Sequence, residues 1–174
     1  MSQVYSGLGY NKTTSGDSDL LLGQIAEFED LDYSLLATPR LSQTPVECMR
    51  VRASETITAK QVLKWTAGYV GLRVSVAGAV DTPCGVAGSY IPSAASGDHF
   101  NMIRKGYGLV TATATDIAAG AMLETGAAGA VSLRAVGQTA GANSFARIDA
   151  TVGAATVAIT ASTSGRAWIN CGSR

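Results

Sequence analysis

The chain has 174 residues, enough for one domain with a hydrophobic core and an additional arm, but few for two full domains. Charged residues make up 15% of it, where an average soluble domain has about 25%, and the apolar fraction is 47%. Because the formal net charge is zero, overall charge gives a nucleic-acid role no support. A fold with so few charges leaves uncharged surface, which favours self-association or docking on a partner.

The charge is divided unevenly along the chain. Residues 1–47 carry seven acids and two bases, a net charge of −5, so residues 48–174 carry +5. The N-terminal part begins polar and glycine-rich, becomes more apolar, and ends at Pro39 and Pro45. We therefore expect an extended acidic N-terminal arm over residues 1–45, with one short helix near Leu20–Asp30, followed by a body over residues 46–174.

Apolar residues of the arm are candidates for contact with a partner or with another copy of the chain. Exposed ion pairs are individually weak, so apolar burial should supply most of the binding energy of the arm. The candidate contact residues are Leu20, Leu21, Leu22, Ile25, Phe28, Leu31, Tyr33, Leu35 and Leu36.

The body has the period-two alternation of β-strands. Short segments alternate apolar and polar residues and are interrupted by Gly, Pro or Asp. No long helical stretch separates them, which argues against βαβ units. The pattern predicts a mainly β fold, a small β-barrel or β-sandwich body of short antiparallel strands preceded by the extended arm. The strand candidates are residues 46–54, 61–67, 71–80, 99–106, 107–115, 130–137, 144–152, 155–163 and 166–171.

The segment DIAAGAMLETGAAGAV, Asp116–Val131, consists mainly of small residues. We expect turns at residues 118–120 and 125–130, whose glycines adopt positive φ, and a short strand at 121–124. A faint repeat relates Gly71–Gly88 to Gly120–Gly137, since both contain Gly-Ala-Val. In a chain this rich in Ala and Gly, such matches also arise by chance, so duplication is one of two explanations.

Catalytic and metal-binding signatures are absent from the sequence. His99 is the single histidine; adjacent strand residues point to opposite faces, so we expect a surface or turn residue that does not act with Asp98. The acids within residues 27–32 lack the spacing of a calcium loop. Trp65 and Trp168 are expected to be buried anchors of the core or an interface. We therefore expect no enzyme activity, no cofactor and no metal.

Cys48, Cys84 and Cys171 have no C-x-x-C spacing, so three buried, unpaired thiols are the simpler expectation and one disulfide with a spare thiol is the alternative. No leader peptide pattern opens the sequence and no apolar run approaches about 18 residues, so we expect a soluble protein without a membrane partner. Residues 99–107 mix aromatic and basic residues but fit a strand equally well, so no nucleic-acid partner is expected.

Residues 60–137 contain a series of short phrases in a distinctive order. They are GVA at 85–87, SGD at 96–98, KGYGLV at 105–110, AAGA at 118–121 and GAAGAV at 126–131. This order resembles the head decoration, or capsid cement, proteins of tailed bacteriophages. The resemblance implies a small β-rich module that binds the outside of the capsid shell, often as a symmetric oligomer, and that has no catalytic residues. The acidic arm departs from the compact members of that family.

From this resemblance we expect a structural decoration protein that is made in the host cytoplasm and located on the outer capsid surface of the virion. Its partners would be the major capsid protein and further copies of itself, as a homotrimer before a dimer, because capsid lattices offer threefold sites. Two other classes remain open. One is a phage adhesin or fibre-type β module that binds a host or a glycan; the other is a small β-barrel hydrolase, which the lack of a usable histidine dyad disfavours.

Overall fold

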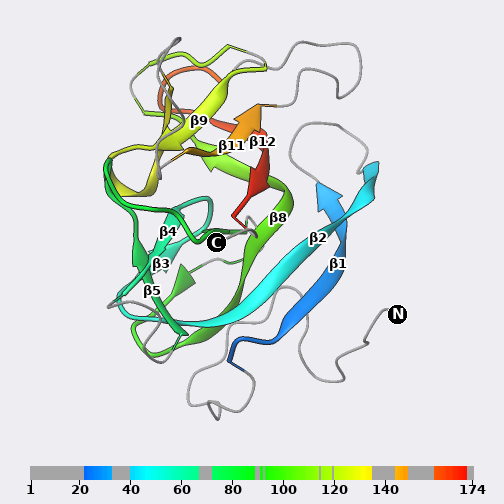
Figure 1. Ribbon diagram of the computed structural model, residues 1–174, viewed down its shortest axis with the longest axis vertical. Coiled ribbons are helices and arrows are strands. Elements are labelled where there is room, and N and C mark those ends of the chain that lie inside the picture. Colours follow the sequence, from blue (N-terminus) through cyan, green and yellow to red (C-terminus); the bar gives the residue numbers. More distant parts are fainter. Residues whose placement is uncertain are drawn as a thin grey trace.

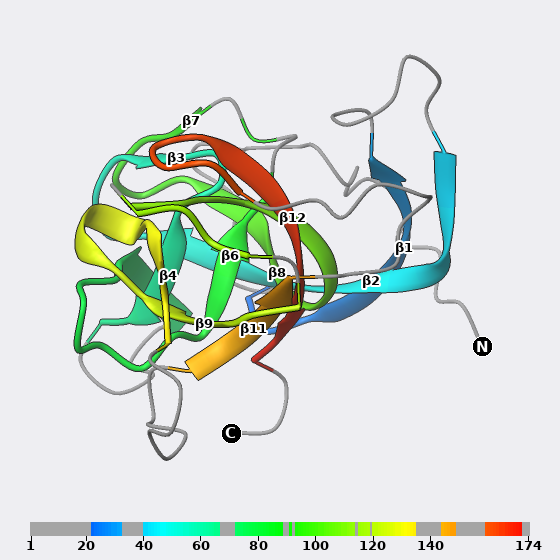
Figure 2. The same ribbon diagram turned by 90° about the horizontal axis from the view of Figure 1, so that it is seen from above.

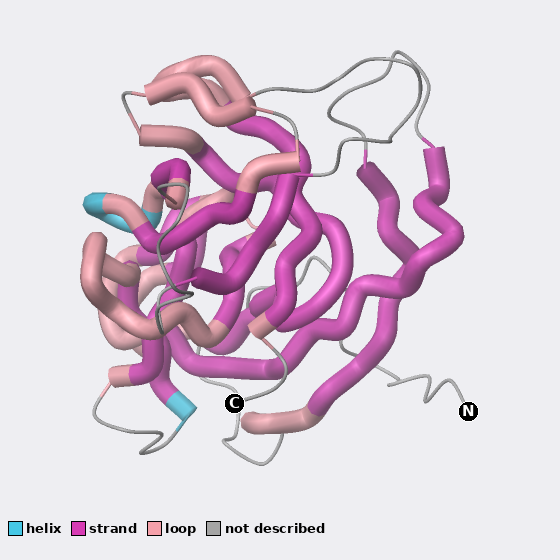
Figure 3. The backbone as a smooth tube through the Cα atoms, turned by 45° about the horizontal axis from the view of Figure 1, so that its top comes forward, coloured by secondary structure: helices cyan, strands magenta, loops and turns pink. Residues whose placement is uncertain are grey.

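The computed structural model describes residues 22–32, 40–66, 72–88, 91, 93–113, 115–118, 120–134, 144–148 and 159–171. These residues are almost entirely strands and loops, with the 3-10 turn η3 (Ala127–Gly129), which confirms the prediction of a mainly β fold (Figure 3). No helix in these ranges has the length and hydropathy needed to span a membrane. The strands are β1 (Ile25–Asp32), β2 (Arg40–Ala53), β3 (Ile57–Thr58), β4 (Val62–Trp65), β5 (Arg73–Val76), β6 (Gly85–Ala87), β7 (Ser93–Ala94), β8 (His99–Thr111), β9 (Met122–Thr125), β10 (Val131–Leu133), β11 (Ser144–Ile148) and β12 (Ser164–Asn170).

Ten of these strands form one mixed sheet in the order β1-β2-β5-β4-β6-β8-β12-β11-β9-β10 (Figure 1). Strands β3 and β7 pair separately as a two-stranded sheet. Because β2 also pairs with β8, the strands β2, β5, β4, β6 and β8 are joined in a closed circuit of hydrogen-bonded pairs. The named strands pair antiparallel except for β2 and β5, which run parallel where Arg52 lies opposite Arg73.

Strands β2 and β8 are long, with 14 and 13 residues, whereas the sequence predicted short strands throughout. They pair antiparallel from Glu47 opposite Lys105 to Arg52 opposite His99. The sequence also predicted separate strands at 99–106 and 107–115, but β8 continues through this junction. Each of the two strands is therefore long enough to contact several neighbours along its length.

Gly106 lies within β8 at the place where β2 approaches most closely. Its φ is +109°, and a Cβ on it would lie 3.0 Å from the carbonyl oxygen of Pro45 and 3.0 Å from the Cα of Val46. Strand β2 shifts its register beside this point, between Glu47 and Cys48. Glycine in a strand interior commonly marks such a close backbone approach, which explains how β8 continues where the sequence suggested a break.

The hydrophobic core lies on both faces of the central strands. Neighbouring residues point to opposite sides, so that Ile103 and Met102 of β8 belong to different clusters. The Ile103 cluster comprises Val46, Cys48, Val62, Ala77, Val86, Ile103, Val110, Ala112, Ile117, Leu123, Val131, Ile159, Ala167, Ile169 and Cys171. The Phe100 cluster comprises Val51, Ala53, Ile57, Leu63, Val74, Cys84, Ala87, Ile91, Ala94, Phe100 and Met102. Burial on both faces gives the sheet a sandwich-like construction.

The two tryptophans are half-buried instead of enclosed. Trp65 ends β4 and packs against the Phe100 cluster from its margin. Trp168 lies between Ala167 and Ile169, which are buried in the Ile103 cluster, so its indole points to the other face of β12. There its ring meets Tyr107 edge-on, with centroids 5.0 Å apart. The expectation that both residues are largely buried is therefore met only in part.

The N-terminal region contains a strand where the sequence predicted a helix. Strand β1 pairs antiparallel with β2 from Ile25 opposite Met49 to Asp32 opposite Arg40, so the helix near Leu20–Asp30 is wrong over its described part. The apolar residues of this segment fit helical spacing only in part. Pairing with β2 therefore decides its conformation. Strand β2 itself runs through the predicted boundary at residue 45 without a break.

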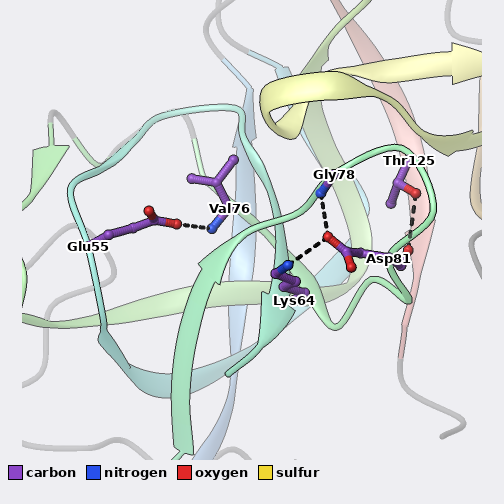
Figure 4. A network of polar contacts seen from close by, with 6 residues as sticks. All are labelled: Glu55, Lys64, Val76, Gly78, Asp81 and Thr125. Carbon is purple, nitrogen blue, oxygen red and sulfur yellow. Dashed lines mark hydrogen bonds and ion pairs between the residues drawn. The ribbon is translucent and has the colours of Figure 1, made fainter. Parts of the chain in front are cut away.

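A polar network fixes the turn between β5 and β6 (Figure 4). The Asp81 carboxylate oxygen Oδ2 accepts hydrogen bonds from Lys64 Nζ, at 2.8 Å, and from the backbone N–H of Gly78, at 2.7 Å. The Thr125 hydroxyl, on β9, donates to the Asp81 carbonyl oxygen at 3.1 Å. The bond from Lys64, followed by the bond from Gly78, lowers the pKa of Asp81 below its ordinary value of 3.8. Asp81 therefore joins β4, its own turn and β9.

Replacing Gly106 by alanine should destabilise the fold. The strained φ alone costs about 1–3 kcal/mol, and crowding against the backbone of Val46 adds to that loss. The free energy of unfolding from chemical denaturation measures the effect. Gly97→Ala is the matched control, because Gly97 also has a positive φ, of +96°, but its added Cβ would lie 3.8 Å from the nearest atom, Arg52 Nη2. If both substitutions lowered the free energy of unfolding equally, the close approach of β2 would add nothing to the cost of the strained φ.

Asp81→Asn should lower the free energy of unfolding at pH 7 by about 0.5–1 kcal/mol, because the partly exposed pair with Lys64 is screened by solvent. The pKa of Asp81 is lower in the folded state, so its charge stabilises the fold above the ordinary pKa of 3.8. That contribution is lost as the pH falls through the folded-state pKa. The difference between the two proteins, measured by urea denaturation, should therefore narrow below pH 3.8. If the difference in the free energy of unfolding did not change with pH, the effect of the substitution would come from side-chain shape and not from the charge of Asp81.

Candidate functional site

The single histidine is part of the interior. His99 is 3% exposed at the start of β8, where it lies opposite Arg52 of β2, so the expected surface or turn position is wrong. The His99 side chain is enclosed by packing against segments distant in the chain, which the local sequence does not reveal. Its neighbour Asp98 accepts a hydrogen bond from the backbone N–H of Ala95 at 2.9 Å, which places this carboxylate in the turn before β8. Buried in this way, His99 is not presented to a substrate in solvent.

The acids of residues 27–32 belong to strand β1. Glu27 is exposed and lies opposite Glu47 of β2, whose Oε1 is 3.9 Å from Arg104 Nη1. Like charges in opposite positions of a strand pair repel each other, and Arg104 offsets part of that repulsion. Within the described part of the chain, no group of three or more His, Cys, Asp or Glu side chains is placed to hold a metal ion.

All three cysteines are buried and none forms a disulfide, which confirms the simpler of the two expectations. Cys84 Sγ lies 3.9 Å from the sulfur of Met102. Burial, with a smaller contribution from Cys171, raises the pKa of the Cys84 thiol. A thiol that stays protonated in an apolar environment is a poor nucleophile and a poor metal ligand, so Cys84 acts as a core side chain.

The structure describes four of the nine candidate contact residues of the arm. Leu22 is half-buried in a turn before β1, Ile25 is 44% exposed on β1, and Phe28 packs against the Ile103 cluster. Leu31 occupies a register position opposite Leu41. Strand alternation separates Ile25 from Phe28, so these two do not share one face. The others, Leu20, Leu21, Tyr33, Leu35 and Leu36, lie outside the described residues.

Two short loops form a pair that the sequence did not predict. They are residues 77–81, between β5 and β6, and residues 125–129, which end in η3; we call them the turn pair. The backbone N–H of Gly129 donates to the carbonyl oxygen of Ala77 at 2.9 Å, and Thr125 donates to the carbonyl of Asp81. One hydrogen bond therefore ties the loops together at each end.

The turn pair exposes apolar side chains. Ala79, Val80, Ala127 and Ala128 are exposed, and Val80 is 91% exposed, compared with 39–44% for the other large exposed apolar residues among the described ones. The predicted turn over residues 125–130 is confirmed, with φ values of +76° at Gly129 and +54° at Ala128, but the positive φ expected at Gly126 is wrong, since its φ is −106°. The sequence signal was the Gly-Ala-Val shared by residues 78–80 and 129–131, but it gave no indication that the two loops touch.

The turn pair and the β1–β2 hairpin lie at opposite sides of the molecule (Figures 1 and 2). In Figure 2 the yellow segment that contains η3 is at one edge of the view, and the blue and cyan strands β1 and β2 are at the other. A contact made through one of these regions therefore leaves the other accessible to a different neighbour.

No family model and no curated protein matches this sequence. A solved structure does match the fold: the N base of the head fiber gp8.5 of bacteriophage phi29. The two chains superpose with a TM-score of 0.50 and 20% sequence identity, over 71% of this chain and 93% of that one. At this level of identity, the similarity establishes a shared fold.

Proposed function

We propose that this chain is a structural protein of the head of a tailed bacteriophage, bound to the outer surface of the capsid as a decoration or cement protein. The observation that carries the proposal is the fold shared with the base of a phage head fiber. The order of short phrases over residues 60–137, which resembles head decoration proteins, supports the same assignment from sequence. A structural role, without catalysis, fits both.

The mechanism is thermodynamic linkage. A protein that binds the assembled shell but not its dissociated subunits stabilises the shell by an amount that grows with its free concentration. Many copies on one lattice add avidity that a single contact does not provide. With 15% charged residues, the chain has the uncharged surface that such contacts use. The partners in this proposal are the major capsid protein and other copies of the chain, as a homotrimer before a dimer.

A second candidate is the attachment base of a head fibre. It is favoured by the description of the matching structure as the base of a fiber and by the 93% of that structure that the match covers. A fibre base anchors a projecting part to the head, and that part can bind a host or a glycan. Cement and fibre base share the outer capsid surface but differ in their effect on the shell.

Heads that lack this chain should rupture at a lower temperature than complete heads, and the purified protein should restore the loss when added back. The expected result follows from linkage, since only the bound form stabilises the shell. Release of DNA during a thermal ramp measures the rupture temperature, and electron microscopy of labelled protein measures where it binds and at how many sites.

Binding with an unchanged rupture temperature would contradict the cement role and favour the fibre base. Absence of binding to heads would contradict both. An unrelated β protein of similar charge serves as the control for nonspecific adsorption during the ramp.

Removal of residues 1–21 should weaken binding to heads about tenfold, because it removes Leu20 and Leu21 among the predicted contact residues. The truncation keeps β1, which pairs with β2 and should be retained for a stable sheet. Occupancy on purified heads as a function of protein concentration measures the affinity, and circular dichroism checks the fold. Unchanged affinity of a folded truncation would contradict a binding role for the segment.

Raising the salt concentration should weaken the binding of the intact protein to heads only modestly, since apolar contacts dominate.

A further inference from the structure

The turn pair carries a surface that the fold itself does not use. Its four exposed side chains, those of Ala79, Val80, Ala127 and Ala128, are all apolar, and residues 77–80 and 126–131 contain no charged residue. Single exposed apolar residues are common on soluble proteins. Here four are gathered on two loops that are hydrogen-bonded to each other, and Val80 is 91% exposed.

The loop that carries Val80 is held by hydrogen bonds at its base. The Asp81 carboxylate binds the N–H of Gly78 and the ammonium of Lys64, and the Asp81 N–H donates to the Gly78 carbonyl oxygen at 3.1 Å. Figure 4 shows these contacts converging below the tip of the turn. Because the backbone is already fixed, binding through Val80 loses little conformational entropy.

Ala128 gives a second indication. Its φ of +54° is a conformation in which glycine has no steric penalty and alanine does. The Ala128 methyl is exposed, so burial in the core does not offset that penalty. A methyl group that the isolated fold holds at a cost is suited to a contact outside the chain.

The small size of the surface distinguishes between possible occupants. Four small side chains offer far less than the about 800 Å² per partner that a stable soluble interface buries, so the turn pair is too small to hold a dimer in solution. On an assembled lattice, avidity among many copies makes small contacts sufficient. Residues 77–80 and 126–129, which carry the four exposed side chains, contain no charged residue, and Asp81 at the base of the turn pair is paired with Lys64. An uncharged partner surface therefore fits these residues, since an unpaired charge buried against them is unfavourable.

We propose that the turn pair inserts into an uncharged, apolar recess on the assembled head shell, with Val80 as the side chain that enters most deeply. This inference rests on the proposed function and identifies the part of the chain that docks. The turn pair lies on the side of the molecule opposite the β1–β2 hairpin (Figure 2).

The test measures binding to DNA-filled heads of the phage that encodes the chain, purified from a lysate in which its gene is deleted. Val80→Asp should weaken the affinity about tenfold or more, and Val80→Ala should weaken it less. Ser93→Asp, which adds the same charge at an exposed position of β7 outside the turn pair, should bind within about twofold of the original protein. Because Val80 is 91% exposed, Val80→Asp should keep the melting temperature of the original protein.

Ala128→Gly separates binding from stability. It removes the positive-φ penalty, so the melting temperature should stay equal or rise, while the affinity for heads should fall about two- to threefold with the lost methyl group. A structural role alone predicts the same change in melting temperature with no change in affinity.

Three outcomes would overturn the inference. If the original protein binds heads and Val80→Asp binds equally well, the turn pair does not contact the shell, and the proposed function stands without it. If Val80→Asp changes the sedimentation of the free protein, the occupant is a second copy. If the original protein itself does not bind heads, the proposed function fails and the inference fails with it.

Discussion

The antiparallel pairing of β2 with β8 is the contact on which the rest of the fold depends. Strand β2 also bonds β1 and β5, and β8 also bonds β6 and β12, so these two strands connect the parts of the ten-stranded sheet. Their register places Val51 opposite Phe100, with both side chains in one cluster. A slip of one residue would turn both side chains to the other face. Gly106 permits this pairing because β2 passes too close to β8 there for a Cβ.

Four carboxylates of the body hold its turns and loops. Asp81, Asp98 and Asp116 each accept a hydrogen bond from a backbone N–H, of Gly78, Ala95 and Ala161 respectively. Glu55 does the same for Val76. A carboxylate used in this way fixes the backbone of a loop. The bonds of Asp81 thereby hold the turn that carries the exposed Val80.

Rigid loops fit the structural role on a phage head that we propose. Stabilisation by many weak, geometrically repeated contacts needs rigid modules more than strong individual sites, because each bound copy then loses little entropy. The proposed role draws on three separate observations: the fold shared with a head fiber base, the phrases that resemble decoration proteins and the apolar loops held by hydrogen bonds. They concern the fold, the sequence and the surface respectively.

The sequence by itself determined the fold class, the turns of the small-residue segment and the burial of the three thiols. Side-chain alternation and glycine placement act within a few residues, so they can be read directly along the chain. The same local rules predicted a helix near residues 20–30 and an exposed His99. The first failed because this segment pairs with β2, and the second because packing between segments distant in the chain encloses His99.

Tertiary structure alone decided which elements meet. The sequence indicated a turn near residue 128 and repeated its Gly-Ala-Val near residue 79, but the hydrogen bond between Gly129 and Ala77 that joins the two loops links residues far apart in the chain. Likewise, the buried strand β6 has no alternation to reveal it, since all three of its residues are enclosed. Strand partners and register depend on hydrogen bonds and packing between distant segments, and no local pattern encodes which segment lies opposite which.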